Sequence, residues 1–223
     1  MRTIFIWDIH WCFDEFVALL EKIKYNVETD QLYLTGDLIN KWPKWVELID
    51  FLVQNPQIKS VIWNNEVNFL RYLYFLNIDD NFQYLEQKWF YDKIYNKKNN
   101  LFDSYLEKFD KKHIDYLKKL PLYIETEKWI LLHWWLFSWK KLEEHHIDEI
   151  TRLRQIDQKP WYEFYNGEKT IIYGHYAQDG LRIRKNTKWL DSGCVYGKHL
   201  TAYCFETGEL WQVSAKKQYV KIE

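Results

Sequence analysis

The chain has 223 residues, of which 47% are hydrophobic and 28% are charged, and its formal net charge is -1. This composition is typical of a folded globular domain and excludes a disordered chain. The nearly balanced charge gives no basis for general attraction to a nucleic-acid duplex or to an anionic membrane surface.

Cysteine use and hydropathy both favour a cytoplasmic protein. Cys12, Cys194 and Cys204 are widely spaced and form no CxxC pair, so reduced thiols are expected rather than disulfides. The first apolar run is interrupted at Asp8 and is too short for a signal peptide. No stretch reaches the roughly 18 apolar residues that a membrane span needs. We therefore expect no membrane partner.

The first third of the chain alternates between strand and helix patterns. A buried run predicts a strand over 3–8, and an amphipathic pattern predicts a helix over 12–23. Further strands are predicted over 31–37 and 58–66, with a helix over 45–54 between them. This alternation indicates a parallel α/β sheet, whose ligands collect at the carboxyl ends of the strands.

The remaining chain divides into a helical part and a strand-rich part. Residues 67–125 are aromatic, rich in Lys and Asn and helical in pattern, which we interpret as an insertion within one domain spanning 1–223. Later strands are predicted to form a second, more antiparallel sheet. They cover 129–133, 170–175, 188–193, 200–206 and 210–215.

Side chains that commonly bind metals follow five of the predicted strands. They are Asp8, His10, Asp37, Asn64, His133 and His175. Each alone is more often a turn, cap or core residue, but six at successive strand ends favour a metal site. Carboxylate, imidazole and amide donors suit Mn, Fe, Zn, Co or Mg. Two such ions about 3.5–4 Å apart form a site for phosphoryl transfer.

The motifs resemble those of a known enzyme family. The series "DIH", "GD", "N-x-E", "H" and "GH" is similar to the calcineurin-like metallophosphoesterases, within the branch of phosphoprotein phosphatases and symmetrical diadenosine tetraphosphatases. The resemblance implies a four-layer α/β/β/α sandwich, two divalent ions and in-line attack by a metal-bridging hydroxide. It assigns one ion to Asp8, His10 and Asp37. The second ion is assigned to Asp37, Asn64, His133 and His175.

Basic residues are the candidates for substrate binding. The segment "ITRLRQIDQKPW" resembles the tetraphosphatase version, so Arg152 and Arg154 are expected to clamp phosphate, unless they are only solvated helix charges. Lys41 stands where the family usually has Arg, which keeps the charge but loses the planar fork. The expected substrate is a nucleoside polyphosphate such as diadenosine tetraphosphate. A phosphoprotein or a small phosphomonoester is the alternative.

One departure from the family pattern concerns proton transfer. Asn65 occupies the position of the family's His, which acts as general acid or as partner to the metal-bound water. An amide cannot donate that proton, and losing such a group typically costs about 10²–10⁴ in rate. His145 and His146 are possible substitutes, although surface positions are the favoured interpretation. A weak or inactive phosphate-binding homologue is therefore the rival hypothesis.

Tryptophan is abnormally frequent, with 13 Trp against 7 Gly. Most of the unusual tryptophans fall where the resembled family has glycine or another small residue. These positions are Trp7, Trp11, Trp42, Trp63, Trp134, Trp135, Trp139 and Trp189. Family glycines there allow close backbone approach to phosphate or positive φ, which a Cβ penalises. Overpacking at about 1–3 kcal/mol per site would sum over six sites to ~6–18 kcal/mol, as much as a domain's whole stability.

We hypothesise that these tryptophans are UGA codons that the native organism reads as glycine. The alternative is a genuinely Trp-rich, decayed homologue. Random decay would not select glycine positions so consistently, which favours the first interpretation.

Overall fold

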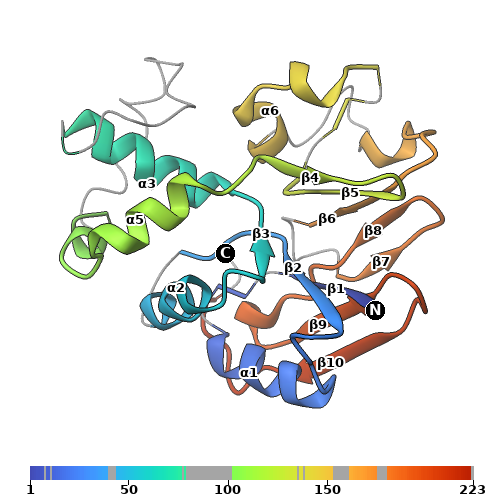
Figure 1. Cartoon of the computed structure of the whole chain (residues 1–223), viewed down its shortest axis with the longest axis horizontal. Coiled ribbons are helices and arrows are strands. Elements are labelled where there is room, and N and C mark those ends of the chain that lie inside the picture. Colours follow the sequence, from blue (N-terminus) through green and yellow to red (C-terminus); the bar gives the residue numbers. More distant parts are fainter. Residues whose placement is uncertain are drawn as a thin grey trace.

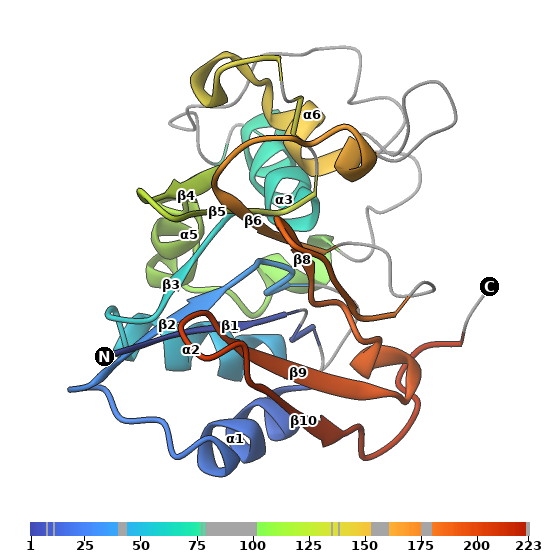
Figure 2. The same ribbon diagram turned by 90° about the vertical axis from the view of Figure 1, so that its right-hand side faces the viewer.

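The computed structural model places two five-stranded sheets face to face, with helices outside them (Figures 1 and 2). It describes residues 1–7, 9–10, 12–39, 44–76, 78, 102–134, 136–137, 139–152, 161–174 and 180–221. Within those residues, no helix has the length and hydropathy needed to cross a bilayer.

The first sheet is built around the N-terminal strand and has the order β10-β9-β1-β2-β3. Strands β1 (Arg2–Ile6), β2 (Asp30–Leu34) and β3 (Lys59–Ser60) are parallel, with Ile4 opposite Leu32. On the other side, β9 (His199–Cys204) and β10 (Leu210–Ser214) add antiparallel. The prediction that these last strands belong to the second sheet is therefore wrong.

The second sheet has the order β4-β5-β6-β8-β7. Its centre is parallel and consists of β5 (Trp129–Leu132), β6 (Thr170–Tyr173) and β8 (Thr187–Trp189). The edge strands β4 (Tyr123–Glu125) and β7 (Arg182–Ile183) are antiparallel. The sheet is thus less antiparallel than predicted, and β4 lies inside the range assigned to the helical insertion.

The helices agree well with the periodicity of the sequence. Helix α1 (Phe13–Lys22) follows β1, and α2 (Trp45–Gln54) has the predicted bounds. Helix α3 (Asn64–Phe75) begins directly after the first sheet's edge, and α5 (Lys111–Lys118) packs against α2 and α3. The predicted third strand is reduced to two residues: residues 61–63 connect β3 to α3, and residues 64–66 already belong to the helix.

Shorter helical segments complete the fold. They are η2 (Leu142–Glu144), α6 (Ile147–Arg152), η3 (Trp161–Glu163) and η5 (Cys194–Tyr196). Helix α6 lies beyond the second sheet, opposite α1 and α2 (Figure 1). The four layers expected from the sequence are therefore confirmed.

Alternation along β1 explains how the layers pack. Phe5 and Trp7 point toward the second sheet, where Phe5 contacts Trp129 edge-on with ring centroids 5.0 Å apart. Ile4 and Ile6, one residue out of phase, join the cluster that contains Phe16 of α1. A strand buried on both faces needs apolar residues at every position, as this run has.

Candidate metal and phosphate site

Three of the predicted ligands lie at the ends of neighbouring elements. His10 follows β1, Asp37 follows β2, and His133 directly follows β5, and all three are buried. His10 Nε2 lies 2.5 Å from Asp37 Oδ2. A backbone hydrogen bond from His10 N to Asp37 O, 3.2 Å long, ties the two loops together. The loops that follow β1 and β2 thus meet at the carboxyl ends of these strands.

Asn65 is the fourth group at this edge. Its amide Nδ2 donates to Asp37 Oδ1 over 2.6 Å, so both carboxylate oxygens of Asp37 are engaged. Asn65 lies in the first turn of α3 and is buried, whereas the neighbouring Asn64 is only half-buried. Asn65 therefore orients the Asp37 carboxylate, a role that an amide can fill although it cannot act as an acid.

The backbone is strained at two predicted ligands. His10 has φ 38° and Asp37 has φ 52°, both in the left-handed region that L-residues rarely occupy. Gly36, with φ 96°, lets the chain turn just before Asp37. Such conformations persist where the surroundings enforce them and cluster at functional sites. Two of them at this edge support its assignment as the functional site.

Glu66 holds the β2 loop against the start of α3. Its Oε1 accepts hydrogen bonds from Leu38 N and Ile39 N, each 2.9 Å, and Oε2 accepts one from Trp63 N at 3.0 Å. Burial raises the pKa of Glu66 to about 7, although these backbone N–H groups oppose the shift. The sequence showed Glu66 only as a motif letter. Glu66 is the third residue of α3, a position from which a Glu side chain commonly accepts a hydrogen bond from the N-cap backbone N–H. That position is the sequence signal from which its role could be predicted.

Two indole rings fill the space between the ligand loops. The Trp63 ring centroid lies 3.7 Å from that of His133 and 5.4 Å from that of His10. Trp7 stacks on His133 at 6.2 Å and meets Trp63 edge-on at 6.0 Å. Trp7 and Trp63 are almost fully buried, with relative exposures of 1% and 2%.

With tryptophan at these positions, the described residues do not fit two metal ions. Ions about 3.5–4 Å apart, each about 2.0–2.2 Å from its donors, need the volume between His10 and His133 to be open. That volume contains the Trp63 indole. The donor types fit, and the obstruction comes from the two side chains that fall on family glycines.

Close packing, rather than backbone strain, marks these tryptophans. The non-glycine residues with positive φ in the described part of the chain are His10, Lys24 and Asp37, so no described tryptophan has the conformation expected of a family glycine. A Cβ on Gly174 would collide with the Trp7 ring. Trp7 Nε1 and Trp189 Nε1 are buried without a hydrogen-bond partner among the described residues. Burying such a donor unpaired is unfavourable.

Several predicted residues lie outside the described residues. They are Asp8, Lys41, Arg154 and His175, together with Trp11, Trp42 and Trp135. Arg152 is the last residue of α6, and only its backbone is described. Their roles stay predictions.

The two histidines considered as substitutes for the missing acid, His145 and His146, differ in their burial. His145 is buried, lies 2.8 Å from Lys141 O through Nδ1, and accepts a hydrogen bond from Phe137 N at Nε2 over 2.9 Å. The surface position favoured for it is therefore wrong, and both of its ring nitrogens are engaged in structural contacts. His146 is exposed, as favoured.

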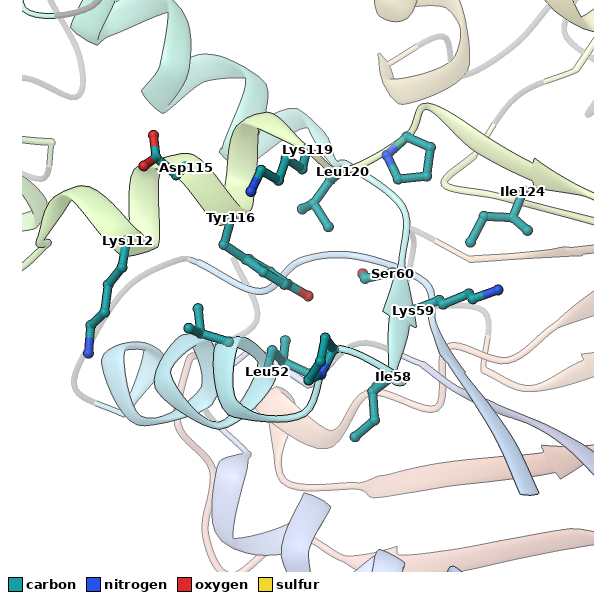
Figure 3. A pocket seen from close by; sticks show the side chains of 13 residues that line it. Leu52, Ile58, Lys59, Ser60, Lys112, Asp115, Tyr116, Lys119, Leu120 and Ile124 are labelled. Atoms are coloured by element: carbon teal, nitrogen blue, oxygen red, sulfur yellow. The ribbon is translucent and has the colours of Figure 1, made fainter. Parts of the chain in front are cut away.

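A pocket of about 660 Å³ lies apart from this site, between α2, β3 and α5. The Tyr116 side chain points across it, and Lys59, Lys112 and Lys119 lie around it (Figure 3). Burial, and to a lesser degree the charge of Glu66, raise the pKa of Tyr116. No predicted site residue lines this pocket, so it is no part of the candidate site.

The two paired mixed sheets, with helices outside them and carboxylate, amide and imidazole side chains at their strand ends, are the arrangement of a metallophosphoesterase. Comparison with known families agrees. Residues 1–195 match the model of the calcineurin-like phosphoesterases, and the chain belongs to that family of metal-dependent hydrolases.

Curated relatives match either nearly the whole chain or a large part of it. A symmetrical bis(5'-nucleosyl)-tetraphosphatase of Neisseria meningitidis is 26% identical, over 94% of each chain. The protein of the same name from Buchnera aphidicola is 35% identical over 136 residues, which is 59% of this chain and 42% of that protein. The first alignment spans 277 positions against 223 residues here, so that relative carries inserted segments.

Solved structures agree with the fold. A crystal structure described as that of a candidate diadenosine tetraphosphatase superposes with a TM-score of 0.77 at 24% identity, covering 96% of this chain and 93% of the other. A serine/threonine phosphatase from Saccharomyces cerevisiae superposes with a TM-score of 0.54 at 13% identity, covering 100% and 81%.

Proposed function

We propose that the protein hydrolyses a dinucleoside polyphosphate of the diadenosine tetraphosphate type, in a form that has glycine at positions 7 and 63. The observation that supports this most is the contact of His10 and Asn65 with the two oxygens of Asp37, at 2.5 and 2.6 Å. The three residues come from three separate parts of the fold, and nothing in ordinary packing requires a buried carboxylate there. The curated relatives are named for this substrate class.

In this proposal two divalent ions, when bound, would supply the Lewis acidity that activates a water and neutralises phosphate charge. Asp8, His10, Asp37, Asn64, His133 and His175 would hold them. The chain's own task is positioning: Asn65 fixes the Asp37 carboxylate, and Glu66 fixes the loop that carries it. Arg152, Arg154 and Lys41 would bind the polyphosphate through its negative charge.

The test is turnover by protein made with glycine at the family's glycine positions. Diadenosine tetraphosphate, p-nitrophenyl phosphate and a phosphoserine peptide are compared, each with Mn²⁺, Co²⁺, Mg²⁺ or Zn²⁺. Symmetrical cleavage gives ADP as the sole nucleotide product. Asp37→Asn should abolish turnover, whereas Asp115→Asn, at the separate pocket, should leave it unchanged.

Two results would overturn the proposal in different ways. Preference for the peptide or for p-nitrophenyl phosphate would make the protein a phosphoprotein or phosphomonoester phosphatase. Binding of metal and nucleotide without turnover would make it a phosphate-binding homologue, the outcome that Asn65 in place of the family's His would explain.

A further inference from the structure

A second group of metal-binding side chains lies outside the phosphoesterase site. Cys12 precedes α1, Glu15 lies in the first turn of α1, and Cys194 begins η5. One donor atom from each lies within 4.8 Å of the other two. Cys12 and Glu15 have no exposed surface and Cys194 is 2% exposed. Two thiols and a carboxylate, brought together from opposite ends of the chain, are thus enclosed in the core.

The Glu15 carboxylate is only half satisfied. Its Oε1 accepts hydrogen bonds from Lys216 N at 2.7 Å and from the Tyr219 hydroxyl at 2.8 Å. Its Oε2 is buried and has no hydrogen-bond partner among the described residues. An enclosed carboxylate oxygen without a donor is unfavourable unless a cation or a proton compensates it.

The C-terminal segment closes this cluster. Tyr219 N and Val220 N both donate to Val195 O, at 2.9 and 3.1 Å, which seats the segment on η5. Burial raises the pKa of Tyr219, and its hydrogen bond with Glu15 and the neighbouring thiols add to the shift. The phenol therefore stays protonated and serves as a donor that fixes the carboxylate.

We propose that Cys12, Cys194 and Glu15 bind one Zn²⁺ ion. Thiolate is the ligand type that selects such borderline-soft ions, and it is a poor ligand for Mg²⁺ or Mn²⁺. With Zn–S near 2.3 Å and Zn–O near 2.0–2.2 Å, tetrahedral donors lie roughly 3.5–3.8 Å apart, so separations of up to 4.8 Å need to contract by about 1.3 Å at most. Three protein ligands leave the fourth position to water.

The competing explanation is that these thiols are ordinary core side chains. Buried free cysteine often behaves as a small apolar residue. Cys204 shows that case: it is fully buried and lies near Glu206, with Sγ 3.5 Å from Oε2, but it belongs to no metal-binding group in the described residues. It is therefore the matched control.

The first experiment uses the unaltered full chain. Zinc is added at one equivalent after dialysis against chelator, and X-ray absorption at the zinc edge counts the sulfur neighbours. Two sulfur ligands are expected. A shell of only nitrogen and oxygen would overturn the proposal, because the phosphoesterase ligands contain no sulfur and would give that result.

The second experiment separates the residues with Co²⁺, which reports thiolate ligands through a charge-transfer band. The band should be lost in Cys12→Ser and in Cys194→Ser, persist in Cys204→Ser, and persist with at least tenfold weaker affinity in Glu15→Gln. Circular dichroism confirms folding of each variant. A band that survives both single cysteine changes, or disappears with Cys204→Ser, would refute the assignment. None of these readouts depends on phosphoesterase activity.

Discussion

Replacing both Trp7 and Trp63 by glycine distinguishes native packing from obstruction. Each indole is buried to within 2% and buries about 150–250 Å² of surface, or ~4–6 kcal/mol at about 25 cal/mol/Å². If both rings are native packing, the double change removes ~8–12 kcal/mol, comparable to a typical domain's whole stability of ~5–15 kcal/mol. Such a protein would not fold.

We expect the opposite result. If glycine is the native residue at both positions, the vacated volume is the metal site, and the double variant folds. Divalent metal at about 100 times its Kd would then stabilise it by ~2.7 kcal/mol. Urea unfolding with and without Mn²⁺ measures this shift, and calorimetry measures the binding.

The matched control is Trp129→Gly. Trp129 is also buried, at 5% exposure, and packs in the same layer between the sheets, but it is not among the positions matched to family glycines. This change should cost the full few kcal/mol and create no metal binding. If the double variant is unfolded, or folds yet binds no metal, the glycine hypothesis is wrong.

Three further predictions concern separate parts of the chain. In protein from its own organism, the tryptic peptide Thr3–Lys22 should have the mass for glycine at positions 7 and 11; the mass for tryptophan would identify a decayed homologue. In an active form, Asn65→His should raise turnover of diadenosine tetraphosphate by about 10²–10⁴, and Asn68→His, one turn along α3, should not. Hydrogen bonds from Arg2, at 2.6 and 2.8 Å, outweigh burial and hold the pKa of Asp30 below its ordinary 3.8. The contribution of Asp30 to the free energy of unfolding is therefore fully present above pH 3.8 and is lost as the pH falls through the folded pKa. In urea unfolding measured at decreasing pH, Asp30→Asn should reduce this loss of stability more than Asp14→Asn does.

Local periodicity predicted the elements better than it predicted their partners. The bounds of α2 and the burial of Phe16 and Leu19 on one face of α1 follow from apolar spacing alone. The place of β9 beside β1 does not, because strand pairing is decided by packing between segments far apart in the chain. The sequence predicts a strand end at Asn64, whereas the structure begins α3 there. A short apolar run before a polar residue occurs both at the end of a strand and before the start of a helix, so the pattern does not separate the two.

The candidate site shows the same division. Asp37 and His10 could be named from their place after strands, and their side chains lie in contact; their role as metal ligands stays a prediction. The hydrogen bonds that Glu66 accepts from Leu38 N and Ile39 N could not be predicted, because every residue except proline has a backbone N–H and the sequence does not show which ones a side chain will bind. Cys12 and Cys194 appeared as isolated thiols until the fold brought both beside Glu15.

The pairing of β1 with β9 bears on how the chain is made. Ile4 faces Cys204 in the register of these strands, so the central strand of the first sheet gains its second neighbour only after residue 204 has left the ribosome. Until then β1 presents an open edge of unpaired N–H and C=O groups, which invites pairing with other chains. Fragments that stop before residue 199 should therefore aggregate, and the first sheet should complete its folding only once β9 is available.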